Sequence, residues 1–243
     1  MALSLNLTKG EQSLKLCLQK SGVVTPPRAD VAFVLDVSGS FDDEHRQGVT
    51  DALLARLVPW GMTFDPDGKL DVFTFSSGRQ GVERVGTVAP ANYEGFVRRE
   101  VIRRVAGYGG GTDYSYVLEE VLRSFGWVQP ESSMLGRLFG GSKPAASPGR
   151  RGLVLFVTDG DNTDRERTER ILAQSQQRGD AVYFLFIGIS NQGGDFPFLR
   201  QIGDRYDNTG LTIIRDLRRF TAQDDDALNG ALLQSELIAW LKG

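Results

Sequence analysis

A run of apolar residues from Val31 to Val37, broken only by Asp36, is the feature that most constrains the fold of this chain. A strand that is apolar on both faces has to be covered on both faces, and such strands are typical of parallel sheets flanked by helices. A carboxylate at the end of a buried strand loses several kcal/mol of hydration unless it meets a cation or hydrogen-bond donors. The run therefore predicts a central strand of an α/β sheet and a partner for Asp36.

Strand and helix patterns alternate along the rest of the chain. Strands are predicted at 70–75, 82–88, 153–157, 181–187 and 211–214, and helices at about 49–57, 93–105, 114–125, 165–177 and 226–241. The second of these strands is predicted to lie at an edge. The order of elements predicts a doubly wound, mostly parallel sheet with one antiparallel edge strand.

The first 28 residues have a different pattern of apolar residues from the rest of the chain. Leucines alternate with other residues over 3–7 and again over 14–18, with Gly10 between the two runs. Alternation with a period of two predicts a β-hairpin, which Thr25 to Pro27 connect to the main fold. We therefore expect an N-terminal hairpin and connector at 1–28 and one α/β domain at 29–243. A Gly, Ser and Pro-rich stretch at 129–150 is predicted to be a flexible insertion.

The charge balance excludes some classes of function. Lys and Arg number 28 against 31 Asp and Glu, a net charge of -3, so no excess of positive charge favours nucleic acid as a partner. Four arginines within 98–104 are interpreted as a solvated face. The single cysteine, Cys17, excludes an intrachain disulfide and indicates a reducing compartment. Without an apolar run typical of a signal peptide or a membrane span, the expected location is the cytoplasm.

Oxygen-bearing side chains occur where the predicted strands end. Asp36, Ser38 and Ser40 follow the first strand, Asp159 follows the strand at 153–157, and a glycine-rich loop leads to Thr112. Ligands of open parallel sheets bind at the carboxyl ends of the strands. Hard cations such as Mg²⁺ prefer oxygen ligands. These five residues therefore predict a divalent cation site.

Residues in each of the three segments also have a local structural interpretation. Ser40 with Asp43 fits a capping box, Thr112 is placed to cap a helix, and Thr163 with Glu166 fits another box. Asp159 and Gly160 fit a turn. The convergence of all these segments at one edge of one sheet favours the cation site.

The order Asp36-x-Ser38-x-Ser40, Thr112, Asp159 resembles the metal-ion-dependent adhesion site (MIDAS) of von Willebrand factor A (vWA) domains. The resemblance covers about 30–240. It implies that Ser38, Ser40 and Thr112 bind the metal directly and that the two aspartates act through water. It further implies Mg²⁺, or another divalent cation such as Mn²⁺ or Ca²⁺, with an Asp or Glu of a protein partner as the last ligand. The implied function is a non-enzymatic, metal-dependent protein-binding module.

Residues 4–11 resemble the N-terminal strand of TerD-type tellurium-resistance proteins. A vWA domain that follows such a segment is similar to the bacterial TerF-like group. The resemblance implies a role in tellurium resistance or stress response, with other proteins of that system as partners. The acidic calcium-binding loops of a TerD domain have no counterpart here, so calcium binding of that kind is not implied.

Two other classes of function compete with a metal-dependent binding module. In a Mg²⁺-dependent phosphoryl-transfer or hydrolytic enzyme, Asp36 would be the nucleophile, but Ser38 stands where the haloacid-dehalogenase type needs a second Asp. The only histidine, His45, is interpreted as exposed, so no base is found for a serine nucleophile. In a structural interaction module, the C-terminal helix would dock through apolar residues that include Trp240.

Two further metal patterns are excluded. Asp65 to Gly68 resembles the start of an EF-hand loop, but Ser76 stands where the loop needs its Glu, so a turn is predicted. One Cys and one His are too few for a structural zinc site.

Overall fold

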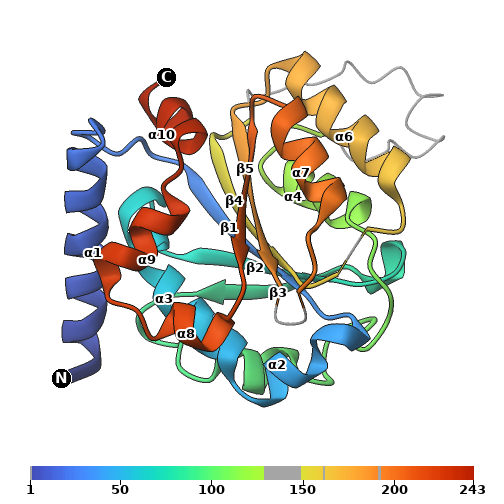
Figure 1. The fold of residues 1–243 in the computed structure, drawn as a ribbon, viewed down its shortest axis with the longest axis horizontal. Coiled ribbons are helices and arrows are strands. Elements are labelled where there is room, and N and C mark those ends of the chain that lie inside the picture. The colour runs from blue at the N-terminus through green and yellow to red at the C-terminus, as the bar shows by residue number, and fades with distance from the viewer. Residues whose placement is uncertain (1, 129–148, 161, 191–192) are drawn as a thin grey trace, which may run out of the picture.

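The strands pair into one sheet whose centre is formed by the apolar run (Figure 1). The computed structural model describes residues 2–128, 149–160, 162–190 and 193–243, so most of the predicted insertion at 129–150 lies outside the described residues. The strands are β1 (Asp30–Asp36), β2 (Leu70–Phe75), β3 (Glu83–Val88), β4 (Gly152–Thr158), β5 (Val182–Ile189) and β6 (Thr209–Ile214), in the order β3-β2-β1-β4-β5-β6. Only β3 is antiparallel to its neighbour. The predicted doubly wound sheet and its antiparallel edge strand are confirmed.

Helices cover both faces of the sheet (Figure 1). The helices of the described residues are α1 (Ala2–Lys20), α2 (Asp42–Arg46), α3 (Val49–Phe64), α4 (Ser115–Ser124), α6 (Arg165–Arg178), α7 (Pro197–Arg205), α8 (Leu217–Thr221), α9 (Asp225–Leu232) and α10 (Ser235–Lys242), with the short 3-10 helices η1 (Gly39–Phe41) and η2 (Arg79–Gly81) and the π-helix η3 (Val97–Val101). Along β1, Phe33 and Leu35 face the core under α3 and α9, whereas Ala32 and Val34 face the core under α4 and α6. A strand buried on both faces needs this all-apolar composition.

The N-terminal segment is a helix, so the predicted hairpin is wrong. In α1, Leu7, Leu14 and Leu18 are buried at helical spacing, whereas Leu16 is 53% exposed. Leucine is a strong helix former, and Thr8 is the only β-branched residue in the segment. The strand that the TerD-type resemblance implied for residues 4–11 is wrong for the same reason. The buried face of α1 packs on α3 and α9.

A pair of leucine substitutions tests this packing. We expect Leu14→Ala to lower the free energy of unfolding by about 2–4 kcal/mol, because Leu14 is fully buried and its truncation leaves a cavity. Leu16→Ala is the matched control and should change it by less than about 0.5 kcal/mol. Both are measured by urea unfolding. Equal losses in the two variants would contradict the helix, since a hairpin would place both leucines on one face.

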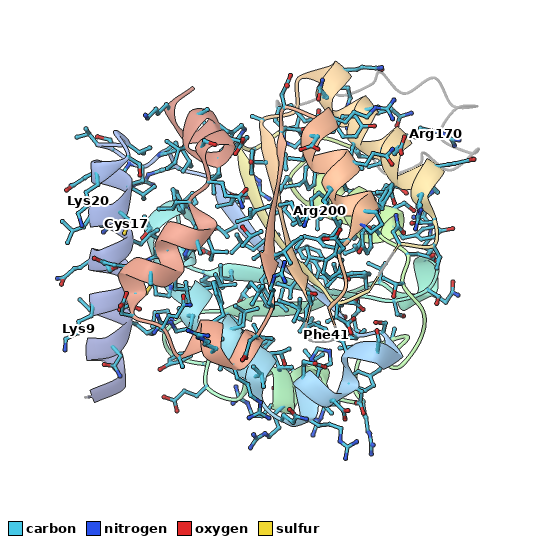
Figure 2. All side chains as sticks on the ribbon, viewed as in Figure 1. Lys9, Cys17, Lys20, Phe41, Arg170 and Arg200 are labelled. Atoms are coloured by element: carbon cyan, nitrogen blue, oxygen red, sulfur yellow. The ribbon has the colours of Figure 1, made fainter. Side chains whose placement is uncertain are left out.

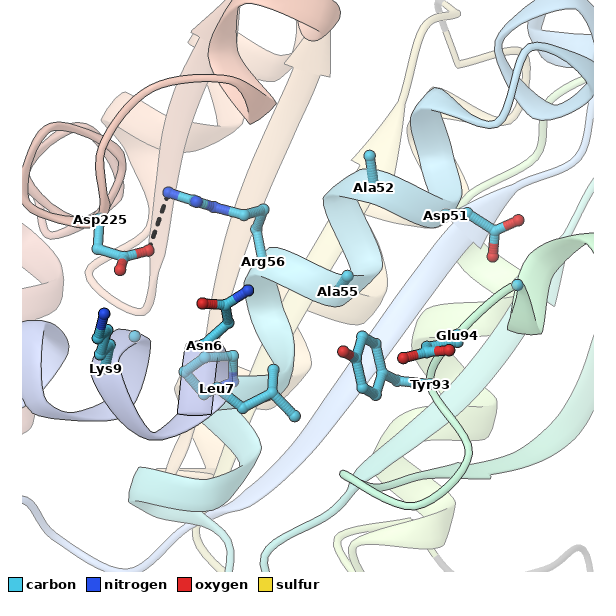
Figure 3. A pocket seen from close by; sticks show the side chains of 13 residues that line it. Asn6, Leu7, Lys9, Asp51, Ala52, Ala55, Arg56, Tyr93, Glu94 and Asp225 are labelled. Carbon is cyan, nitrogen blue, oxygen red and sulfur yellow. Dashed lines mark ion pairs between the residues drawn. The ribbon is translucent and has the colours of Figure 1, made fainter. Parts of the chain in front are cut away.

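An open pocket of about 590 Å³ lies between α1, α3 and the loop at 93–95 (Figure 3). Arg56 and Asp225 form an ion pair of 3.0 Å at its side, and Leu7, Ala55 and Tyr93 contribute apolar surface. None of the five predicted metal ligands lines this pocket. Helix α1 also carries Lys9 and Lys20, which are labelled in Figure 2 and are both exposed.

Two predicted helices differ from the structure. Over 93–105 only the five-residue π-helix η3 forms, and Arg103 has φ +57°, which ends regular helical structure there. The arginines of this segment are exposed, as predicted. The predicted helix at 226–241 breaks between Leu232 and Ser235 into α9 and α10. No helix of the described residues has both the length and the apolar character needed to cross a membrane.

Candidate metal centre

Asp36 ends β1 with its carboxylate fully buried. The amide of Ser38 donates to Oδ1 at 2.8 Å, and the hydroxyl of Thr158, at the end of β4, donates to Oδ2 at 2.6 Å. Burial raises the pKa of Asp36 to about 6, although these hydrogen bonds act in the opposite direction. The carboxylate is thus held by neutral donors at the junction of the two central strands.

The prediction that His45 is exposed is wrong. The side chain is 1% exposed, and its Nε2 lies 2.9 Å from the backbone oxygen of Asp36. A carbonyl oxygen only accepts, so Nε2 carries the hydrogen and Nδ1 accepts from the Thr50 hydroxyl at 3.0 Å. Burial lowers the pKa of His45 to about 4, which keeps the ring neutral. His45 therefore fixes the end of β1 to the helices that follow it.

The two serines after Asp36 continue the site toward Asp159. Ser38 Oγ and Ser40 Oγ lie 3.1 Å apart, and Ser40 Oγ donates to Asp159 Oδ1 at 2.9 Å. The capping box proposed for Ser40 and Asp43 is wrong, because the cap of α2 is Phe41 and no side chain caps it. The structure therefore joins Ser38, Ser40 and Asp159 in one chain of hydrogen bonds.

The glycine-rich loop runs beside the Asp36 segment and delivers Thr112. Gly39 donates its amide to Gly110 O at 2.9 Å, and Gly109 donates to Val37 O at 2.8 Å. Thr112 is 7% exposed, and its Oγ1 would lie 3.1 Å from a Cβ on Gly160, the residue after Asp159. It does not cap α4, whose cap is Tyr114. Within the described part of the chain, no residue hydrogen-bonds to the Thr112 hydroxyl, so this hydroxyl is available to a ligand, although the Thr112 backbone oxygen accepts from Thr163.

No basic side chain of the described residues forms an ion pair with Asp36 or Asp159, the two carboxylates at this edge of the sheet. Burial, followed by the charge of Asp36, raises the pKa of Asp159 to about 7. No three His, Cys, Asp or Glu side chains of the described residues are grouped to hold a metal. A cation here would therefore use hydroxyls together with the two carboxylates, and this all-oxygen donor set fits a hard divalent ion.

The raised pKa of Asp159 gives an expected pH dependence in the presence of chelator. Between pH 3.8 and about 7 the folded state keeps a proton that the unfolded state releases, so its stability falls as pH rises through this window. Asp159→Asn removes this penalty. At pH 8 it should be more stable than wild type by about 1–2 kcal/mol, a value reduced for partial solvent screening.

Urea unfolding at pH 8 and pH 4.5 measures this effect, and the difference between the two proteins should shrink at the lower pH. The lowered pKa of His45 has the opposite effect, because it reduces the stability of the protein as the pH falls below the unfolded pKa of 6.5. This effect of His45 is the same in both proteins, so it cancels in the difference between their free energies of unfolding. An Asn variant that is less stable than wild type at both pH values would show that the carboxylate carries no such penalty.

The fold is that of a vWA-type domain. A family model, described as the vWA domain found in the TerF C terminus, matches residues 28–243, so the chain belongs to this vWA-TerF-like family. The match begins after α1 and does not include the segment likened to TerD. The uncharacterized protein YcbR of Bacillus subtilis is 28% identical over 238 residues, which are 96% of this chain and 85% of that protein.

Solved structures of a mussel byssus protein are among those with a similar fold. Proximal thread matrix protein 1 in its crystal form 2 matches with a TM-score of 0.52 and 18% identity, covering 86% of this chain and 48% of that one. A structure of the same protein with a zinc-occupied MIDAS motif matches with a TM-score of 0.51 and 19% identity, with the same coverage. This chain thus spans about half the length of the mussel protein, and at this identity the likeness shows the fold alone.

Proposed function

We propose that this chain is a metal-dependent protein-binding module of the MIDAS type. The observation that carries the proposal is the continuous contact from Ser38 through Ser40 to Asp159, with Asp36 buried beside it and no basic side chain of the described residues paired to either carboxylate. Ser38, Ser40 and Thr112 would bind the cation directly, and Asp36 and Asp159 would hold its water ligands.

The chemistry that such an ion supplies is attraction for a carboxylate. Hydroxyl ligands bring no charge, so an ion bound mainly through them keeps more attraction for an incoming Asp or Glu than one in a carboxylate cage. Mg²⁺ is the proposed ion, with Mn²⁺ and Ca²⁺ as alternatives. The zinc-occupied MIDAS motif of the mussel protein supports a divalent cation at a site of this kind.

The family supports a bacterial setting for the module. We place it in a tellurium-resistance or stress-response system of the cytoplasm, on the TerF-like family description and the single cysteine. The partner would then be another protein of that system that presents an acidic side chain. Nucleic acid remains disfavoured by the charge of -3.

We further propose that the module has no hydrolytic activity of its own. His45 is neutral and both of its ring nitrogens are engaged, by Asp36 O and Thr50, so it does not serve as a base for Ser38 or Ser40. Phosphatase and esterase screens with Mg²⁺ test this. Robust turnover that disappears in Asp36→Asn would favour the enzyme instead.

Docking through the C-terminal helix is the remaining alternative, and the packing of Trp240 argues against it. The Trp240 ring lies 5.6 Å from the ring of Tyr183, and the guanidinium of Arg151 stacks over it at 4.2 Å. The aromatic surface of Trp240 is thus largely covered by contacts within the chain.

Affinity capture from a bacterial lysate tests the binding function. Wild type with Mg²⁺ should retain a partner that chelator, Asp36→Ala and Thr112→Ala each release. Thr221→Ala is the control, because this threonine lies in α8 and donates to Leu217 O within that helix. A partner that is held equally in chelator and by both site variants would show that binding does not require the metal.

A further inference from the structure

The segment around Thr112 is fixed from two sides, by the turn after β2 and by Thr163. We infer that Thr163 is a positioning residue, which sets the place of Thr112 relative to Asp159 and so makes the cation site selective for small ions. This inference rests on the proposed function.

The first contact ties Thr112 to the loop that carries Asp159. The backbone oxygen of Thr112 accepts from Thr163 N at 3.0 Å and faces the Thr163 hydroxyl at 2.9 Å. Thr163 follows Asp159 by four residues in the same loop. The two ligand segments are thereby held directly to each other and not only through the sheet.

The second set of contacts ties the neighbours of Thr112 to the turn after β2. Gly111 donates its amide to Ser77 Oγ at 2.7 Å, and Asp113 donates its amide to Ser76 O at 3.2 Å. The Asp113 carboxylate accepts from Gly78 N at 2.7 Å through Oδ2 and from the Thr163 hydroxyl through Oδ1. Backbone motion of Thr112 is thus opposed on both sides, while its own hydroxyl stays available.

Thr163 has no evident role in the core that would explain these contacts. Its side chain is exposed, and the cap of α6 is Asp164, so the capping box suggested by Thr163 and Glu166 is wrong. The hydroxyl instead reaches back across the site to Thr112 and Asp113. Its removal therefore leaves neither a buried cavity nor an uncapped helix.

The expected consequence is selectivity between ions of different size. Mg²⁺ demands near-ideal octahedral geometry at about 2.0–2.1 Å, whereas Ca²⁺ accepts six to eight oxygens at about 2.3–2.6 Å in flexible arrangements. Mn²⁺ prefers oxygen ligands in the same octahedral geometry and serves as the probe for the small ion. When Thr112 is held in one place, the site favours the small ion. When Thr112 is free to shift, the affinity for the small ion falls more than the affinity for Ca²⁺.

Calorimetric titration of the whole chain with Mn²⁺ and with Ca²⁺ tests the inference. Thr163→Val keeps the shape of the side chain and removes its hydroxyl, and we expect it to weaken Mn²⁺ binding about tenfold, in the range typical of groups that orient metal ligands. Ca²⁺ binding should change by less than about threefold. Thr163→Ser restores the hydroxyl and should bind Mn²⁺ as wild type does. Thr221→Val loses a comparable hydroxyl bond in α8 and is the control.

Each outcome separates the inference from the proposed function. If wild type binds Mn²⁺ and Thr163→Val matches it within about twofold, or loses Mn²⁺ and Ca²⁺ affinity equally, the positioning role is overturned while the metal site stands. Loss of affinity in Thr163→Ser as well would assign the effect to the methyl group and also overturn it. Failure of the wild-type protein to bind either ion would overturn the proposed function itself. Thermal melts in chelator confirm that every variant is folded.

Discussion

Mn²⁺ or Mg²⁺ at about a hundred times its dissociation constant should raise the melting temperature of this protein by about 5–10 °C. The proposed ligands come from segments as distant as Asp36, Thr112 and Asp159, so the unfolded chain would offer no comparable site and the binding free energy would add to stability. A hundredfold excess contributes about 2.7 kcal/mol, and each kcal/mol shifts the midpoint of a chain of this size by about 2–4 °C.

Thr112→Val should remove most of this rise with little change in chelator, because no described residue hydrogen-bonds to the hydroxyl that is lost. Thr221→Val provides the opposite control: it should melt lower in chelator yet keep the full metal-induced rise. Differential scanning calorimetry with and without chelator measures both. A rise that persists undiminished in Thr112→Val would place the cation elsewhere on the chain.

Gly107→Ala should lower the free energy of unfolding by about 3 kcal/mol or more. Gly107 has φ +71°, and a Cβ there would lie 2.1 Å from Ser76 Oγ and 2.8 Å from the Cα of Gly81. The alanine therefore meets backbone strain and a clash with the turn after β2, which also anchors the Thr112 segment. Metal affinity should fall together with stability.

Gly109→Ala is the matched control for the glycine loop. Gly109 has φ +81°, but a Cβ there would meet nothing within 4 Å. Only the strain of the left-handed conformation remains, about 1–2 kcal/mol. Urea unfolding and Mn²⁺ titration of both variants measure the difference. Equal losses would mean that strain alone explains the glycine at position 107 and that the close approach to Ser76 is relieved at no cost.

The sheet could be predicted from the sequence because its strands carry an unambiguous signal. The run from Val31 to Leu35 is apolar at every position, and only a strand covered on both faces needs that composition. The five candidate ligands were likewise predicted, because polar residues at strand ends share one edge by topology. Whether they bind a metal stays a prediction for the experiments above.

The features that the sequence did not predict depend on contacts between distant segments, or on a residue spacing that fits more than one structure. Leucines two residues apart fit a strand, yet Leu7, Leu14 and Leu18 also fit a helix, and only packing against α3 and α9 decides between them. His45 lies in a helix too short to show a buried face by periodicity. Thr163 has the spacing of a capping box, and its contact with Thr112 O, 51 residues away, has no sequence signature.

The order of the strands divides the sheet at a seam. β1, β2 and β3 come from the first part of the chain and β4, β5 and β6 from the second, and the two halves meet only between β1 and β4. The bond from Thr158 to Asp36 and the bond from Ser40 to Asp159 both cross that line. An ion bound there would link two halves of the sheet that are synthesised at different times. A protein partner would then bind at the junction of the two halves, and neither half alone would offer the complete site.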